Sequence, residues 1–195
     1  MNRIDVREET MASVEGYARI STAFRVARRL VVVGDPSAPT GVSIGEESVA
    51  SPFIKDYDAV PDNHPSDWVR RFDTSRWRVF TAFVCDARIG GAILIPPNDR
   101  AVVPAVAELW DLRVDPAWRR CGVARTLWAT MEAAAIADGA SVLEIETQHI
   151  NVAACRLYQT HGGLLASVDR SAYPLLPDEV RLRWRKALPV RDRAT

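Results

Sequence analysis

The sequence predicts one α/β domain with a mixed sheet, and the order of its periodic segments carries this prediction. Short apolar runs of strand length alternate with two longer runs of helical spacing in the second half of the chain. A glycine follows each helical run, Gly139 and Gly162, as expected for a helix end. The expected elements are, in order, strands 78–85, 89–95 and 106–114, helix 121–137, strand 142–148, helix 151–161, and strands 164–168 and 180–184.

The first third of the chain gives weaker signals. Residues 17–33 favour a strand, because apolar and polar residues alternate in their first half and valines dominate their end. A helix is the alternative for the arginine-rich middle of this segment. Composition predicts loops at residues 34–45 and 61–65, with an extended segment at 48–57 between them. Ser66 and Asp67 are expected to cap a short helix that continues to residue 72.

Length and charge fit a single domain with an ordinary core. The 195 residues include 25 lysines and arginines and 25 aspartates and glutamates, so the formal net charge is zero. This balance argues against nucleic-acid or membrane-surface binding driven by bulk charge. The three cysteines have no CxxC spacing, so neither a disulfide framework nor a metal site is expected. Because we find no signal pattern and no apolar run long enough to span a bilayer, we expect a cytoplasmic protein.

The stretch 119–124 lies between the strand ending at Val114 and the helix that follows it. A glycine-bearing turn into a helix exposes backbone N–H groups, and the helix dipole and nearby arginines favour a bound anion. These features predict a phosphate-binding loop, with a plain helix start and solvated arginines as the alternative.

Two motifs, in this order and separated by one strand, resemble the GNAT superfamily (GCN5-related) of N-acetyltransferases. The first, Arg/Gln-x-x-Gly-x-Gly/Ala, is matched by Arg119, Gly122 and Ala124. The second, Asn-x-x-Ala-x-x-x-Tyr-x-x-x-Gly, is matched on the next helix by Asn151, Ala154, Tyr158 and Gly162.

Within the superfamily, the chain is similar to the streptothricin acetyltransferase group. Two positions depart from the pattern: Arg120 stands where many members have glycine, and Gly163 stands where an aromatic residue is usual. The similarity rests on residues 51–57, Glu146, Thr147, Gln148, Ile150, Asn151, Val152, Ala154, Cys155, Leu157, Tyr158, Asp169, Tyr173, Asp178, Glu179 and Trp184.

The resemblance implies a single domain over residues 1–195. Its sheet would be mixed and mostly antiparallel, with six or seven strands flanked by helices and splayed between the central strands. The family-like core would span 79–188, with 1–78 as the N-terminal part that supplies the acceptor side and 189–195 as a tail. A monomer or homodimer is expected.

Acetyl-CoA is the implied cofactor, held in a notch between the strands that end at Val114 and Gln148. Backbone amides of the loop would bind its pyrophosphate, since Gly122 and Ala124 let the backbone come close. The expected cofactor-binding residues are Leu112, Arg113, Val114, Arg119, Arg120, Cys121, Gly122, Val123, Ala124, Arg125, Asn151, Ala154 and Tyr158.

Tyr158 is the expected general acid, because acetyl transfer from a thioester to an amine ends with a thiolate that benefits from a proton. A core tyrosine with a satisfied hydroxyl is the alternative. Asn151 is either a cofactor contact or a helix N-cap, and the two roles are compatible.

A carboxylate is expected to receive the proton of the acceptor amine. Asp111 is the first candidate, because it falls where streptothricin acetyltransferases carry an acidic residue, and Glu146 is the second. Glu108 is the third, since strand alternation puts it on the face of Trp110 and opposite Asp111 unless a bulge intervenes. A surface or ion-paired residue is the alternative for each. Asp56, Tyr57, Trp110 and Asp111 are expected to contact the acceptor, since carboxylates and aromatic rings suit a cationic amine.

The remaining reactive side chains are expected to be structural. Cys121 and Cys155 are read as small thiols rather than covalent acetyl carriers, because direct transfer is the superfamily's usual route. His149 and His161 have no partner at ligand spacing. The alternating arginines of 181–185 are expected on the solvent side of the last strand.

The activity implied is acetyl transfer from acetyl-CoA to a primary amine of a small molecule. A streptothricin-type antibiotic is the first candidate acceptor, which would make the protein a resistance enzyme. A protein N-terminal or lysine acetyltransferase is the alternative, and a non-catalytic acyl-CoA binding or sensing module is the alternative of another class. A dinucleotide-binding fold is disfavoured, because the chain has no GxGxxG.

Overall fold

The computed structural model of the protein describes residues 3–34, 41–98 and 104–189. These residues belong to two compact units. The first unit takes in the described parts of Met1–Phe24, Lys55–Leu143 and Leu188–Thr195, and the second takes in those of Arg25–Ile54 and Glu144–Ala187.

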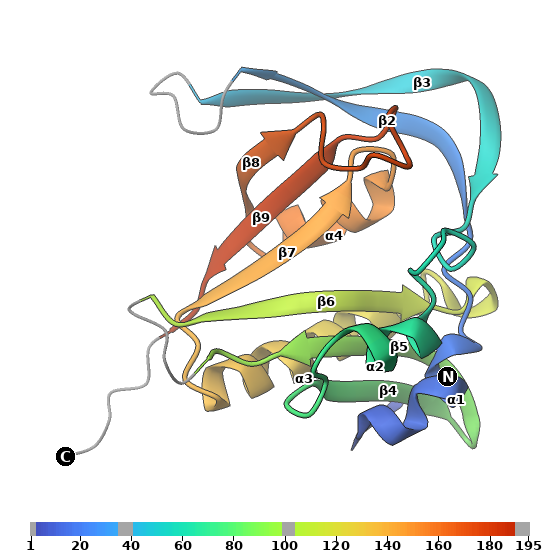
Figure 1. The fold of residues 1–195 in the computed structure, drawn as a ribbon, viewed down its shortest axis with the longest axis vertical. Helices are drawn as coiled ribbons and strands as arrows, with labels where there is room; N and C mark the ends of the chain where they lie inside the picture. Colours follow the sequence, from blue (N-terminus) through green and yellow to red (C-terminus); the bar gives the residue numbers. More distant parts are fainter. Residues whose placement is uncertain (1–2, 35–40, 99–103, 190–195) are drawn as a thin grey trace. The chain divides into compact units, whose positions relative to one another are not determined.

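Four antiparallel strands form the sheet of the first unit. In spatial order they are β1 (Asp5–Glu9), β4 (Arg78–Val84), β5 (Ala87–Ile95) and β6 (Val106–Val114). Helix α3 (Val123–Ala137) packs against β4, β5 and β6 (Figure 1). The helices of this unit that precede β4 are short, namely η1 (Met11–Ser13), α1 (Val14–Ala18) and α2 (Pro65–Arg71), and η2 (Pro116–Trp118) follows β6.

Two glycines of β5 let helices approach both faces of this sheet. Gly90 and Gly91 are consecutive, so any side chains there would point to opposite faces. A Cβ on Gly90 would lie 2.7 Å from Val123 Cγ1 of α3, and a Cβ on Gly91 would overlap the ring of Tyr17 in α1. The first unit therefore has α3 on one face of β5 and Tyr17 on the other.

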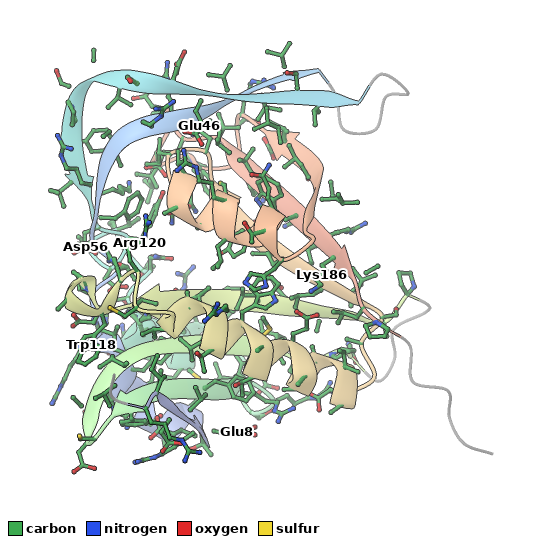
Figure 2. The ribbon with its side chains drawn as sticks, turned by 180° about the vertical axis from the view of Figure 1, so that it is seen from behind. Glu8, Glu46, Asp56, Trp118, Arg120 and Lys186 are labelled. Atoms are coloured by element: carbon green, nitrogen blue, oxygen red, sulfur yellow. The ribbon has the colours of Figure 1, made fainter. Side chains whose placement is uncertain are left out.

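The second unit contains three sheet strands, one helix and a two-stranded ribbon. Most of β7 (Val142–Gln148) lies in it, with β9 (Arg181–Ala187) and β8 (Leu164–Asp169) next in spatial order, and α4 (Val152–Thr160) follows β7. The ribbon consists of β2 (Phe24–Gly34) and β3 (Val42–Lys55) (Figure 1). Its β3 residue Glu46 forms an ion pair with Arg156 of α4, 2.6 Å between Oε2 and Nη2, and Glu46 is labelled in Figure 2.

The fold class is confirmed, since the strands are mostly antiparallel and helices flank them. The predicted bounds of β6 and β7 match the structure, because apolar residues recur in both at strand spacing. Residues 35–40 of the predicted first loop and residues 190–195 of the predicted tail lie outside the described residues. The extent of the single domain stays a prediction.

Three local predictions are wrong. The strand expected over 17–33 begins only at Phe24, and Tyr17 belongs to α1, because its ring packs into the core beside Gly91. Strand β3 begins at Val42 and so includes part of the predicted loop. Helix α2 is capped by His64, whose Nδ1 accepts from the amide of Ser66, and Pro65 occupies its first turn. Within the described residues, no helix is long and apolar enough to cross a membrane.

Candidate functional site

The predicted phosphate-binding loop has a left-handed backbone at two positions. Gly122, which precedes α3, has φ of +87°, and Arg120 has φ of +66°. A residue with a side chain is disfavoured in this region by roughly 1–2 kcal/mol. Arg120 is the position at which the sequence departs from the glycine of the motif, so the arginine retains the backbone conformation that glycine prefers.

The loop presents unbonded amides to open space. The first hydrogen bond of α3 runs from Thr126 N to Gly122 O, 3.0 Å, so the amides of Val123, Ala124 and Arg125 have no carbonyl partner within the helix. A methyl group on Gly122 would meet nothing closer than the Arg125 guanidinium at 3.9 Å. Such a helix start can hold an anion between backbone N–H groups.

The arginines of the loop differ in their contacts. Arg119 donates through Nη2 to Ala23 O, 2.7 Å, and through Nε to Val114 O, 3.1 Å, and burial lowers its pKa. Arg119 therefore ties the loop to the end of β6. Arg120 and Arg125 are exposed, and Arg120 is labelled at the start of α3 in Figure 2. These two side chains supply the loop's exposed positive charge.

Asp111 is held by two donors on one of its oxygens. Its Oδ2 accepts from Tyr17 Oη at 2.5 Å and from Arg113 Nε at 2.7 Å. Neither donor contacts Oδ1, and no described residue provides a hydrogen bond to that atom. Burial and then the Asp111 charge raise the pKa of the Tyr17 phenol, so Tyr17 remains a donor at neutral pH. Asp111 is thus fixed in position with one oxygen left to accept a proton or a hydrogen bond.

Arg113 is a buried cation that joins two carboxylates, and its side chain is only 1 % exposed. Its Nη1 and Nη2 donate to Asp58 at 3.1 and 3.2 Å, and Nη1 also donates to Ile20 O. Burial works against its charge, but Asp111 and the other neighbouring groups more than offset this and raise its pKa. Burial is also the main cause of a raised pKa at Asp58. The Arg113 side chain, predicted near the cofactor, therefore organises these carboxylates.

A bulge in β6 brings Asp111 to the face of Trp110. The register with β5 shifts between Ile93, which faces Asp111, and Leu94, which faces Leu109, so Trp110 is the extra residue. Trp110 packs against the cluster that contains Tyr17, and the Tyr17 hydroxyl bonds to Asp111. The bulge therefore interrupts the regular alternation of side chains along β6, which is the exception that the sequence analysis allowed for.

Aromatic rings and a further carboxylate lie in the same unit. The Trp110 ring lies 5.9 Å from that of Trp68 and 4.8 Å from that of Trp77. Asp56 Oδ1 accepts from Thr22 Oγ1, 3.0 Å, and from the amide of Asp58, 3.1 Å.

The predicted acceptor residues Asp56 and Asp111 are thus linked through Asp58 and Arg113, and Trp110 is the chain neighbour of Asp111. Tyr57 instead lies near Phe24, with 6.0 Å between the ring centroids and the two rings tilted. Asp58 was missed from the sequence, where its one signal was its place two residues after Asp56.

In the second unit, α4 holds Tyr158 between two well-defined ends. Asn151 Oδ1 accepts from Ala154 N at 3.2 Å, so Asn151 is the helix N-cap. After the helix, the amide of Gly163 donates to Tyr158 O at 2.8 Å, and that of Gly162 donates to Gln159 O. This is a Schellman ending. A Cβ on Gly163 would lie 2.9 Å from Tyr158 O, which explains why no aromatic residue stands there. Tyr158 itself is 6 % exposed.

Glu146 is part of a hydrogen-bonded chain. It accepts from Tyr173 Oη at 2.9 Å, and Tyr173 accepts from Gln148 Nε2 at 3.2 Å. Burial, followed by the Glu146 charge, raises the pKa of Tyr173. Arg181 and Arg183 lie 3.7 and 3.5 Å from Glu146 Oε2.

The alternating arginines of β9 lie on the more exposed side of the strand, as expected, because Leu182 and Trp184 between them are buried. Arg183 and Arg185 pair with Glu144 at 2.8 and 2.7 Å, and Arg181 pairs with Asp169 at 2.8 Å. Cross-strand carboxylates balance their charge, so this strand has no unbalanced basic patch.

Cys155 is not an activated nucleophile. Cys155 is buried, and burial raises the pKa of its thiol to about 12, which disfavours the reactive thiolate. Cys121 is exposed beside the Arg119 carbonyl. Among residues 3–34, 41–98 and 104–189, no cluster of histidine, cysteine, aspartate or glutamate has the geometry to hold a metal ion.

The family model described as "Acetyltransferase (GNAT) family" matches residues 46–162, more than half of the chain. No curated protein matches the chain in sequence. Solved structures are similar in fold. The nourseothricin acetyltransferase has a TM-score of 0.74 at 21 % identity, with 95 % of this chain and 99 % of that chain covered.

Two further structures extend the comparison. A protein described as a streptothricin acetyltransferase from Bacillus anthracis str. Ames, in complex with acetyl coenzyme A, has a TM-score of 0.74 at 22 % identity, covering 96 % of this chain and 98 % of that one. The ribosomal-protein-S18-alanine N-acetyltransferase from Escherichia coli has a TM-score of 0.61 at 18 % identity, covering 100 % and 99 %.

The loop before α3 suits the acetyl donor of this family. The unbonded amides of Val123, Ala124 and Arg125 and the exposed guanidinium groups of Arg120 and Arg125 match the charge and donor needs of a pyrophosphate. The chain is therefore an acyltransferase that takes its acetyl group from acetyl-CoA. By the match of its residues 46–162 to the family model, the chain belongs to the GNAT acetyltransferase family.

Proposed function

We propose that the protein acetylates a primary amine of a small, cationic molecule by direct transfer, in the cytoplasm. The observation that carries this proposal is the placement of Asp111. Tyr17 and Arg113 hold its Oδ2, and Oδ1 is left to accept a proton. Arg113 bonds to two carboxylates, Asp58 and Asp111, and Asp56 accepts from the amide of Asp58, so this cluster holds three carboxylates and one buried arginine. The excess of negative charge favours an ammonium group.

The residues brought together above have separate tasks in the proposed reaction. The loop 119–125 holds the pyrophosphate on its amides, with Leu112 and Val114 as neighbouring contacts. Acetyl-CoA supplies the acetyl group as an activated thioester. Asp111 Oδ1 receives the proton that the acceptor ammonium must lose, with Glu146 as the second candidate. Tyr158 Oη carries the proton that returns to sulfur.

Aromatic side chains support a small organic cation as the acceptor. Trp110, which is partly buried, lies next to Asp111 in the chain, and cations bind well over the faces of tryptophan rings. A streptothricin-type antibiotic or a similar β-lysyl compound is the first candidate, because nourseothricin and streptothricin acetyltransferases share the fold. The fold of the ribosomal-protein-S18-alanine N-acetyltransferase keeps a protein N-terminus as the second candidate.

A thiol-release assay with acetyl-CoA tests the proposal, using streptothricin, aminocyclitol, polyamine and peptide acceptors, with mass spectrometry of each product. We expect release with at least one small amine and little with peptides. Asp111→Asn, which is nearly isosteric, should lower kcat by about 10²- to 10⁴-fold. Tyr158→Phe should also lower kcat while acetyl-CoA binding persists. Acetyl-CoA binding without release for any amine would instead favour a sensing module, and full turnover in both variants would refute the assigned roles.

A further inference from the structure

A pocket of about 370 Å³ lies entirely within the second unit. Its walls come from β2, β3, the turn between β7 and α4, and the segment that precedes β9. The volume is within the range of small-molecule sites. None of the roles assigned above uses this pocket. Its lining includes Arg29, Phe53, His149, Leu175, Asp178 and Glu179.

His149 is held firmly in the wall of this pocket and is only 6 % exposed. Its amide donates to Val180 O at 3.0 Å, and its carbonyl accepts from Leu30 N at 2.8 Å. Its ring Nδ1 accepts from the amide of Val180 at 3.1 Å. The ring therefore cannot turn without breaking a hydrogen bond to the segment before β9.

The proton of the His149 ring lies on Nε2. Burial, followed by Arg29, lowers the pKa of His149, so the ring is neutral at pH 7. A neutral imidazole has one N–H group, and because Nδ1 is an acceptor here, Nε2 is the donor.

This donor faces open space. No described residue accepts a hydrogen bond from His149 Nε2. Within the described residues, the enclosed side-chain nitrogen and oxygen atoms that have no partner are Arg181 Nε, Arg183 Nε and Trp184 Nε1, so His149 Nε2 is not enclosed. Because His149 lines the pocket, its unpaired N–H group is available to a ligand there.

The charged residues of the lining leave no surplus charge. Arg29 and Asp178 are both exposed and carry opposite charges. Glu179 is buried and has a partner of its own, and the ring of His149 is neutral. A charged ligand would lose hydration, and it would be attracted by one of the two exposed groups and repelled by the other. The lining therefore favours an uncharged ligand.

The rim of the pocket is apolar and exposed. Phe53 is 45 % exposed and Leu175 is 69 % exposed, although both are large hydrophobic residues. Ile150 and Leu176 extend the apolar surface within the pocket. A ligand with an apolar body would remove this surface from water, at a gain of roughly 25 cal/mol per Å².

We propose that this pocket binds an uncharged molecule that combines an apolar body with an oxygen acceptor, such as an amide or ketone carbonyl. The Nε2–H group of His149 donates to that oxygen, and the apolar body covers Phe53 and Leu175. The inference does not rest on the proposed function, because occupancy of the pocket can be measured in the absence of acetyl-CoA.

Titration of the full chain with three probes, followed by NMR, tests the preference for an uncharged ligand. Phenylacetamide, phenethylamine and phenylacetate share one apolar body and carry a neutral, a positive and a negative head group. We expect phenylacetamide to bind at least about fivefold more tightly than either ion, because only the ions lose the hydration of a charge. Equal or tighter binding of either ion would overturn the proposal.

The variant His149→Asn tests the hydrogen bond. Asparagine keeps an acceptor for the amide of Val180, but its shorter side chain does not reach the position of Nε2. Phenylacetamide should bind about three- to tenfold more weakly, which is the scale of one hydrogen bond. Ethylbenzene has no acceptor and should bind as it does to the parent. Unchanged binding of phenylacetamide, or equal loss of both compounds in a folded variant, would contradict the role of Nε2.

The ring signals of the parent chain give the same answer without a variant. Long-range ¹H–¹⁵N NMR spectra report each imidazole nitrogen. Phenylacetamide should shift the Nε2 signal of His149 more than ethylbenzene does, and it should leave the signals of His64 and His161 in place. A His149 signal that does not respond would refute the contact.

Exposed positions locate the binding without endangering the fold. Phe53→Ser and Leu175→Ser should each weaken the binding of phenylacetamide and of ethylbenzene by about three- to tenfold. The controls Ile54→Ser and Leu164→Ser change side chains that are 67 % and 75 % exposed and do not line the pocket, so they should bind as the parent does. Equal loss in a test variant and its control would refute the location.

Discussion

Arg120 has a left-handed backbone in the turn before α3. Two substitutions at this position can therefore distinguish the effect of backbone strain from the effect of the side-chain charge. Glycine adopts φ of +66° without strain, so Arg120→Gly should raise the free energy of unfolding by about 1 kcal/mol. Arg120→Ala removes the same charge but keeps the Cβ, so it is the matched control and should show no such gain. Denaturant unfolding of the three proteins measures the effect.

The same pair of variants reports on acetyl-CoA binding. If the Arg120 charge assists the pyrophosphate, both variants should bind acetyl-CoA more weakly by a similar factor of about 2–5. A glycine variant no more stable than the alanine variant would contradict the strain argument.

His149 makes the stability of the protein depend on pH. Burial, then Arg29, lowers its pKa, with Glu179 and Glu47 acting in the opposite direction. The unfolded state therefore takes up a proton first, and the contribution of His149 to stability is lost as pH falls below about 6.5. The amide of Val180 donates to His149 Nδ1 at 3.1 Å. The variant His149→Asn removes the titratable ring but keeps a side-chain acceptor for this amide. Unfolding free energy should fall less steeply between about pH 6.5 and 5 in this variant. Parallel curves would assign the acid sensitivity to other groups.

At the scale of elements, strand β5 sets the position of α1. Because Gly91 lies against the Tyr17 ring, Gly91→Ala should displace the ring and destabilise the protein by about 1–3 kcal/mol. The displacement would also weaken the bond between Tyr17 and Asp111, so kcat should fall more than acetyl-CoA affinity does.

Tyr17→Phe is the companion variant, because it removes the hydroxyl and keeps the ring in place. It should reproduce the loss of kcat with a smaller loss of stability. If Gly91→Ala left kcat unchanged, the position of the ring would not govern Asp111.

The strands with regularly recurring apolar residues could be predicted from the sequence, and the short helices could not. Strands β6 and β7 are predicted by their apolar residues. Asn151 was predicted as a possible N-cap of α4, because an asparagine at the start of a helix can accept a hydrogen bond from a backbone amide of the first turn. Helix α1 has only five residues, too few to show a helical period. The side chain of Arg113 lay beyond prediction, because its burial depends on Asp58, 55 positions away. The bulge at Trp110 was foreseen only as an alternative, since it depends on pairing with β5.

For the whole molecule, acetyl-CoA should act as a stabilising ligand. At 100 times its dissociation constant it should add about 2.7 kcal/mol to the free energy of unfolding, or roughly 5–10 °C in a chain of this length. S-acetylpantetheine lacks the pyrophosphate and should give a much smaller shift at equal concentration. Equal thermal shifts for the two compounds would contradict a pyrophosphate contact at the loop before α3.

Tyr17 lies outside the part of the chain that the family model matches, residues 46–162, yet it fixes the carboxylate proposed to take the proton. The match to the family is therefore carried by residues 46–162, whereas the proposed function also depends on Tyr17, which lies outside that range. Exchange of the first 24 residues between relatives would alter the preferred amine while leaving the signature of the family intact. In such a lineage, sequence similarity would record shared descent more faithfully than shared substrate.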